Sequence, residues 1–369
     1  VIVFLRPLGL RLGTKCVAAV TFFVRGAEKA PLGGPAVLSL QNFFLKGFFL
    51  MTQANHPAFV RLSSLGVTTV TGKDALAFLH GQFTNRLQPL GKRAPLAGYC
   101  SPKGRLLATM RVWGEGDAIS LLLPKSVEPA FLKRIRMYVL RSDVHFAADE
   151  DRTLLAGFGE EAETLLKDRL AAAGAELPAE NEAAVTPDLT VVRVPDAPSL
   201  ASVTDVCVRY LVLAKDPDAF SPAEDDSYWW ATEAAAGIGS VFAATADRFV
   251  PQSINYELTD GVVFNKGCYP GQEVVSRIQH IGTPARRMAL GLVETNVLPE
   301  AGAGVYALKG GARTLSGDVV FAAKGEGAAA VLVSIPTGDF EHELSLDEDG
   351  GRALKLAALP YEIRNVLDS

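Results

Sequence analysis

The chain has 369 residues, of which 49% are hydrophobic and 21% are charged, so it is long enough for two or three domains with packed cores. Its formal net charge of −5 argues against a large nucleic-acid footprint, although it leaves room for a local basic groove. The four cysteines are scattered without a Cys-x-x-Cys pair, which indicates a reducing compartment and argues against a self-contained zinc or iron–sulfur site. No apolar run reaches the ~18 residues of a membrane span, so we expect no membrane partner.

The first fifty residues differ in composition from the rest. They contain six Lys or Arg but only one acidic residue, Glu28, and the first methionine of the chain is Met51. Three interpretations are open: an acid-poor targeting segment, a stretch upstream of the true start, or a helix on a membrane surface. We therefore predict that residues 1–50 are a non-native or targeting extension that is not part of the fold.

The region after Met51 begins with alternating strands and helices. The β-branched run 67–71 predicts a strand, and Asp74 is placed to cap a helix through Phe83. A turn marked by Pro102 and Gly104 then precedes a predicted strand over 106–113 and its hairpin partner over 119–123.

A basic helix is predicted to begin at Ser126 and to run through Val139. Its apolar positions recur at helical spacing, and the other positions are basic. This helix either lies at the mouth of a site for an anionic ligand or presents a solvated surface face. The basic residues are Lys133, Arg134, Arg136 and Arg141.

The second half of the chain predicts fewer helices. Residues 171–188 are typical of a surface connection, and 203–214 predict a strand. A short helix is expected over 228–236, ended by Gly237. From residue 287 onward, short strands separated by glycine turns predict a small β-barrel. The whole pattern predicts an α+β body over 51–286 and a C-terminal β-barrel domain over 287–369.

The run 265–271 carries the strongest chemical signal. Its glycines and proline predict a tight loop, and the pattern becomes helical from Gln272. Cys268 is therefore expected just before a helix N-terminus, where the helix dipole and Lys266 would both favour the thiolate. The alternative is a buried, inert cysteine, which is how we interpret Cys100 and Cys207.

The same loop resembles a family signature. Lys266-Gly267-Cys268-Tyr269-x-Gly271-Gln272-Glu273, followed by Arg277, is similar to the signature of the YgfZ-type folate-binding proteins, which are relatives of the glycine cleavage T-protein (GcvT), an aminomethyltransferase. The segments 249–255, 79–85 and 98–105 also resemble landmarks of that family. The resemblance covers roughly 59–369 and makes Cys268, with the other signature residues, the expected functional centre.

The resemblance implies a GcvT-like fold of three domains in a ring around a central folate cavity, with a ferredoxin-like subdomain at roughly 106–205. It implies a tetrahydrofolate-binding factor for the assembly, maturation or repair of iron–sulfur proteins, which supports tRNA modification indirectly. The expected partners are folate and iron–sulfur client or scaffold proteins, without direct contact to nucleic acid. The expected location is the bacterial cytoplasm, or the mitochondrial matrix if residues 1–50 are a targeting segment.

One departure from the aminomethyltransferases is informative. Where the T-protein carries an Asp-Asp pair with one aspartate essential for methylene transfer, this chain has Ala108 and Thr109. Neither residue can act as an acid or base at neutral pH, so we expect no conventional aminomethyltransferase activity. A folate-dependent one-carbon transferase is the enzyme alternative, and an RNA-interacting module with a continuous basic stripe is a third.

A folate site needs amide side chains for the pterin and basic residues for the anionic glutamate tail. We expect no complete metal site, because Cys268 alone cannot hold an iron–sulfur cluster and would have to share one with a partner or bind it transiently. The predicted cofactor-binding residues are Asn85, Gln252 and Asn255 for the pterin end, Lys103 and Arg105 for the tail, and Gly98.

Overall fold

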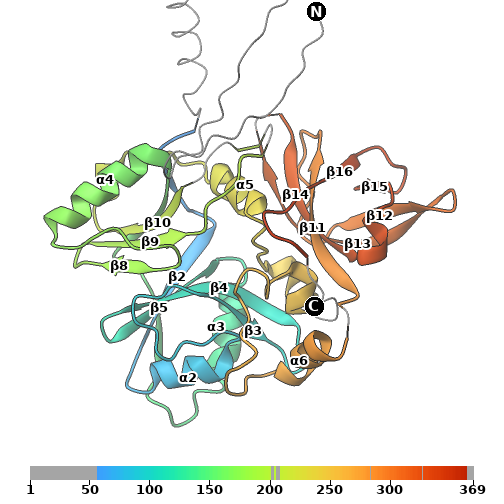
Figure 1. Ribbon diagram of the computed structural model, residues 1–369. Helices are drawn as coiled ribbons and strands as arrows, with labels where there is room; N and C mark the ends of the chain where they lie inside the picture. The colour runs from blue at the N-terminus through green and yellow to red at the C-terminus, as the bar shows by residue number, and fades with distance from the viewer. Residues whose placement is uncertain (1–55, 201–202, 205–207, 283, 326, 364–369) are drawn as a thin grey trace, which may run out of the picture. The chain divides into compact units, whose positions relative to one another are not determined.

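The computed structural model describes residues 56–200, 203–204, 208–282, 284–325 and 327–363. The extension predicted over 1–50 lies outside the described residues, as do Cys16 and Cys207. Every element described below belongs to the unit Ala54–Ser369. In that unit the strands form two open five-stranded sheets and one closed six-stranded barrel (Figure 1).

The first open sheet has the strand order β3-β4-β5-β2-β6, and all neighbouring strands are antiparallel. α2 (Ala75–Gln82) and α3 (Glu128–Arg136) pack on it through the buried side chains of Leu79, Phe131 and Ile135. Its strands are β2 (Leu65–Thr71), β3 (Leu96–Cys100), β4 (Leu106–Glu115), β5 (Ala118–Pro124) and β6 (His145–Ala148).

The predicted start of the helix after Asp74 is confirmed, but the predicted cap is not. Asp74 occupies the N-cap position of α2 without a capping side-chain bond. Its Oδ2 instead accepts a hydrogen bond of 2.8 Å from the backbone N–H of Asp143. The carboxylate thus links α2 to the segment before β6.

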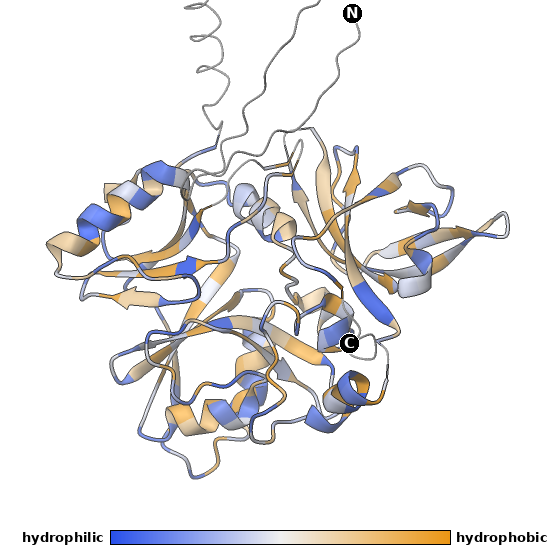
Figure 2. Ribbon diagram, in the orientation of Figure 1, coloured by the Kyte–Doolittle hydropathy of each residue, from blue (hydrophilic) through white to orange (hydrophobic). Residues whose placement is uncertain are grey.

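The second open sheet has the order β1-β7-β10-β9-β8 and is covered by α4 (Gly159–Ala172). Side chains of β10 alternate between two cores: Val212 packs under α4, whereas Leu211 faces the other way. Figure 2 shows the matching mixture of hydrophobic and hydrophilic residues on α4. The strands are β1 (Phe59–Arg61), β7 (Thr153–Phe158), β8 (Ala183–Val185), β9 (Leu189–Val194) and β10 (Arg209–Ala214).

The sequence pattern missed or misplaced parts of this second sheet. α4 was not predicted, and its last turn and β8 occupy part of the segment 171–188 that we expected to be a connection. The strand expected over 203–214 is a strand from Arg209 onward. The strands within 106–205 are divided between the two sheets, because β4, β5 and β6 belong to the first and β7, β8 and β9 to the second.

The predicted C-terminal β-barrel is confirmed. Its strands close in the order β11-β14-β13-β12-β15-β16. Successive residues of β14 alternate between the barrel interior, where Val333 lies, and the core shared with the preceding elements, where Leu332 lies. The strands are β11 (Arg286–Val293), β12 (Gly304–Lys309), β13 (Ala312–Lys324), β14 (Ala329–Pro336), β15 (Leu344–Ser345) and β16 (Ala353–Ala357), and η4 (Thr337–Asp339) follows β14.

The segment between the second sheet and the barrel carries short helices. The predicted helix over 228–236 is confirmed as α5, which contacts β13 and β14 of the barrel. Gly237 follows it with a φ of 64°, the left-handed conformation that ends helices. The elements are η1 (Asp218–Phe220), α5 (Ser227–Ala235), η2 (Ala243–Thr245), η3 (Pro251–Ile254) and α6 (Gln272–His280).

Candidate functional site

The signature loop leads directly into α6, as the sequence predicts. Gly271 is the N-cap of α6, with a φ of 80°. A Cβ atom on Gly271 would lie 2.7 Å from both Cα and N of Gly104, and even closer to the carbonyl oxygen of Ser101. The turn before β4 and the start of α6 therefore touch backbone to backbone, which explains glycine at both positions.

Cys268 lies three residues before that N-cap, and its side chain is exposed. The interpretation as an accessible thiol agrees with this placement, and the alternative of a buried small side chain does not. Cys100 is buried, and burial raises the pKa of its thiol to about 12. Of the cysteines that the structure describes, Cys268 is thus the one that can meet a partner or an oxidant.

Lys266 anchors the loop to the end of α2. Its Nζ donates hydrogen bonds of 2.6 Å to the carbonyl oxygen of His80 and 2.5 Å to that of Phe83. Burial and, to a smaller extent, the charge of Arg86 lower the pKa of Lys266 to about 8. Arg86, which sequence reasoning missed, also donates to the carbonyl oxygen of Asn265. The ammonium of Lys266 is therefore engaged with α2 and positions the loop that presents Cys268.

The remaining signature residues divide between surface and core. Glu273 and Arg277 form the expected i, i+4 ion pair at 3.3 Å, with both side chains exposed. Tyr269 is buried, and burial raises the pKa of its hydroxyl. Gln272 is half-buried at the first position of α6, and a Cβ atom on Gly267 would meet nothing within 4 Å.

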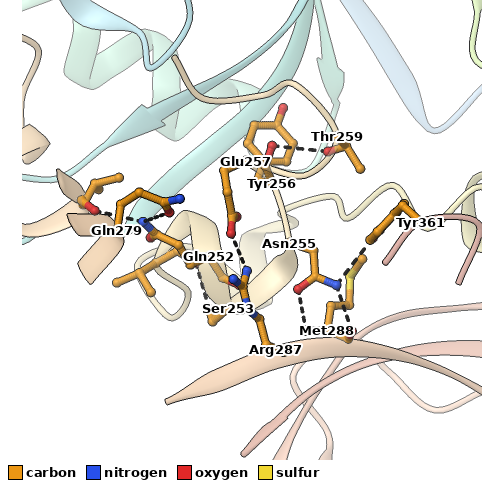
Figure 3. Close-up of polar contacts among 12 residues, drawn as sticks. Gln252, Ser253, Asn255, Tyr256, Glu257, Thr259, Gln279, Arg287, Met288 and Tyr361 are labelled. Carbon is orange, nitrogen blue, oxygen red and sulfur yellow. Dashed lines mark hydrogen bonds and ion pairs between the residues drawn. The ribbon is translucent and has the colours of Figure 1, made fainter. Parts of the chain in front are cut away.

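The three amide residues expected to hold a pterin form hydrogen bonds inside the protein, and Figure 3 shows two of them, Gln252 and Asn255. Asn255 donates from Nδ2 to the carbonyl oxygen of Met288 at 2.9 Å and accepts from its N–H at 3.1 Å. Gln252 donates to the carbonyl oxygen of Val275 at 2.8 Å. Asn255 thus links the end of η3 to β11, and Gln252 links η3 to α6. Both side chains hold these elements together.

Asn85 is buried in the same way. Its Nδ2 donates to the carbonyl oxygens of Leu96 and Asp260 at 2.7 and 2.5 Å, and its Oδ1 accepts from the N–H of Arg86. Gly98 lies in β3, where its N–H donates to Thr84 at 2.7 Å. Both residues fix the backbone around the end of α2.

Lys103 and Arg105 are exposed at the turn before β4. Arg105 donates to the carbonyl oxygen of Arg248. It lines a surface pocket shared with Arg248 and Arg286, and Lys103 lines neither that pocket nor the cavity described next. The structure therefore separates these two basic residues from the buried amide residues with which we grouped them.

A cavity of about 40 Å³ lies between β4, β5 and α5. Thr109 lines it, and the Oγ1 of Thr109 accepts a hydrogen bond of 2.9 Å from the N–H of Val241. Ala108 is buried in the core on the α2 side of the sheet. Ala108 and Thr109, where the resemblance places the acid pair of the aminomethyltransferases, thus hold no carboxylate, and Thr109 faces the cavity.

Charged residues that sequence reasoning missed line this cavity. Glu233 of α5 is 8% exposed and accepts a 2.7 Å hydrogen bond from the fully buried Arg209. Arg111 of β4 is buried, and burial lowers its pKa to about 10. Trp229 and Trp230 stand next to Glu233 along the wall. The sequence held one signal for this role. Glu233 is the one acidic residue in the predicted helix 228–236, whose other residues are mostly apolar, and a buried carboxylate there would be costly without a partner.

Membrane-spanning helices and clusters of metal-ligating side chains are both absent from the described residues. Within the ranges given above, no helix combines the length and apolar character that crossing a bilayer requires. In the same part of the chain, no three His, Cys, Asp or Glu side chains come together as a metal site would need.

Known proteins resemble this chain over most of its length. No family model matches the chain. The tRNA-modifying protein YgfZ of Shigella boydii serotype 4 (strain Sb227) is 28% identical over 306 residues, covering 82% of this chain and 92% of that protein. The YgfZ of Escherichia coli O7:K1 gives the same identity and coverage, and that of strain SMS-3-5 is 27% identical. The resemblance to the YgfZ-type proteins is confirmed.

The comparison with solved structures tests the predicted GcvT-like fold. The crystal structure of the glycine cleavage system aminomethyltransferase T from Bartonella henselae matches with a TM-score of 0.62, over 84% of this chain and 87% of that one. At 16% identity this likeness shows the fold alone. The GcvT-like fold predicted for this YgfZ-like chain is therefore confirmed, including the closed barrel.

Proposed function

We propose that this YgfZ-like chain binds a reduced folate in the cavity beside α5 and acts in the maturation or repair of iron–sulfur proteins. The main support for folate binding is the set of residues that line this cavity. Glu233 and Arg111 supply buried charge, and Trp229 and Trp230 supply aromatic surface. These groups lie at the wall that also contains Thr109.

The lining chemistry fits a pterin ring. A pterin presents adjacent N–H groups, which a carboxylate such as that of Glu233 accepts, and a carbonyl oxygen, which the guanidinium of Arg111 can approach. Aromatic walls favour a flat ring. The cavity is smaller than usual ligand pockets of about 300–1,000 Å³, so binding requires wall side chains to move. Leu96, Trp230 and Ser240 are the half-buried residues of the wall.

The cavity supports binding without one-carbon transfer. Thr109 offers a hydroxyl that already accepts a backbone N–H, and it cannot take a proton from an amine at neutral pH. Folate would therefore be bound as a ligand or as a carrier whose chemistry is completed elsewhere. This is the reason that we favour a maturation factor over an aminomethyltransferase.

The iron–sulfur part of the proposal relies on Cys268. An exposed thiol on a loop held by Lys266 and by Gly271 is presented to a partner rather than to the interior. A cluster needs more thiolate ligands than this loop provides, so a client or scaffold protein would supply the others. The relatives are named tRNA-modifying proteins, and we propose that this chain supports the same process through its clients.

Complementation tests this role. In a bacterial strain that lacks its own YgfZ, the wild-type chain should restore the activity of iron–sulfur enzymes, and Cys268→Ala should not. Ser276→Ala, a comparably small change on α6, is the matched control and should restore activity fully. If Cys268→Ala restored activity as well as the wild-type chain, at the same protein level, the thiol would have no role in the function.

A further inference from the structure

A second pocket, of about 460 Å³, lies where the turn before β4, η3 and the end of α6 meet the barrel. Its volume is within the usual range for small-molecule sites. It shares no lining residue with the cavity beside α5. Three arginines from separate segments line it: Arg105 before β4, Arg248 before η3, and Arg286 at the start of β11.

Backbone contacts fix the position of each guanidinium. Nη1 of Arg105 donates to the carbonyl oxygen of Arg248. Nη1 of Arg248 donates to the carbonyl oxygen of Gly302 at 3.0 Å, and Nη1 of Arg286 to that of Ser316 at 2.8 Å. A guanidinium has five N–H donors, and among the described residues these side chains bond through Nη1, which leaves donors for a ligand.

The pocket has an excess of positive charge. Asp318, the acidic residue among those that line it, pairs with Arg248 at 3.2 Å. Three guanidinium groups against one carboxylate leave two positive charges. The other walls are largely apolar, from Phe249, Val250, Ile278, Pro284 and Ala285.

We propose that this pocket binds a phosphate monoester that carries a compact apolar or aromatic body, of about the size of a nucleoside monophosphate. A phosphate monoester carries a charge of about −1.5 to −2 at pH 7 and accepts several hydrogen bonds, which matches the charge and the donors of the three arginines. The apolar walls then contact the body of the ligand. A single carboxylate would balance only half of the excess charge.

Calorimetric titration of the full chain with AMP, at pH 7.5 and low salt, tests the proposal. Arg105→Gln and Arg286→Gln should each weaken AMP binding by about tenfold or more, because each removes a charged hydrogen-bond donor. Arg313→Gln is the matched control: Arg313 pairs with Glu343 on the barrel, outside the pocket, and its removal should leave binding unchanged. Tetrahydrofolate should not displace AMP, because the two sites share no residue.

Asp318→Asn should change the AMP affinity in the opposite direction to the arginine variants. It therefore tests the proposal even if an arginine variant fails to fold. It removes the one carboxylate and should tighten AMP binding. Binding should also weaken below pH ~6, where a phosphate monoester loses one negative charge, whereas a carboxylate ligand such as triglutamate keeps its charge there. Absence of AMP and inorganic phosphate binding, stronger binding of triglutamate than of AMP, or an unchanged affinity in Asp318→Asn would each overturn the proposal.

Discussion

Gly104 and Gly271 face each other so closely that neither position has space for a side chain. A Cβ atom on Gly104 would lie 2.8 Å from Cβ of Val274, and one on Gly271 would lie 2.7 Å from Cα of Gly104. Both glycines have positive φ, 72° and 80°. This contact joins the turn before β4 to the helix that follows Cys268, although the two lie far apart in the sequence.

We expect Gly271→Ala to destabilise the protein by more than about 2 kcal/mol. The left-handed conformation alone costs a non-glycine residue about 1–2 kcal/mol, and the clash with the backbone at Ser101 adds to it. Chemical denaturation measures the loss. Gly267→Ala, in the same loop, is the control: its Cβ meets nothing within 4 Å, so a similar loss there would contradict the account.

Alkylation should separate the two cysteines that the structure describes. In the native protein, iodoacetamide should modify Cys268 readily and Cys100 very slowly, because Cys100 is buried and its pKa is raised to about 12. Peptide mass spectrometry reads out each site. Rapid modification of Cys100 without unfolding would show that the loop and β3 pack differently.

Lys266 should make the stability pH-dependent above neutrality. Its native pKa of about 8 is below the ordinary 10.5, so between these values the unfolded chain binds more protons than the native one. Its contribution to the free energy of unfolding should therefore rise with pH across that window. Denaturation of the wild type and of Lys266→Met from pH 7 to 10.5 should show a difference that changes in that direction, and a constant difference would disprove it.

Asn255→Ala should lower the stability of the protein without a specific effect on folate binding. It leaves the buried N–H and C=O of Met288 without their partner, at a cost of about 1–3 kcal/mol for each group. A melting-temperature decrease without a specific loss of folate affinity is the expected result. A variant with wild-type stability that no longer binds folate would restore the role that the sequence suggested for Asn255.

The signature loop was predictable because its residues carry local geometry. The glycines and proline of 265–271 predict a tight loop, and the pattern from Gln272 predicts a helix with Glu273 and Arg277 on one face; the helix and the ion pair are both present. The barrel was predictable because short strands between glycine turns have few alternative folds. α4 was missed although its buried residues Ala162, Leu166 and Leu170 recur at helical spacing.

The roles of the amide residues were not predictable from sequence. Asn85 and Asn255 have the chemistry that a pterin needs, but the same chemistry satisfies backbone groups where distant segments meet. Only the fold shows that these side chains already form hydrogen bonds to backbone groups. It also shows that Glu233, rather than these amides, lines the cavity. Pairings across more than a hundred residues, such as Lys266 with the end of α2, leave no local trace in the sequence.

Calorimetric titration with tetrahydrofolate tests the central claim most directly. The wild type should bind with one site, Glu233→Gln should bind at least about tenfold more weakly, and Lys266→Ala should keep wild-type affinity, because Lys266 does not line the cavity. Circular dichroism should first show that each variant is folded. Absence of binding to the folded wild type, or equal affinity in Glu233→Gln, would contradict the account.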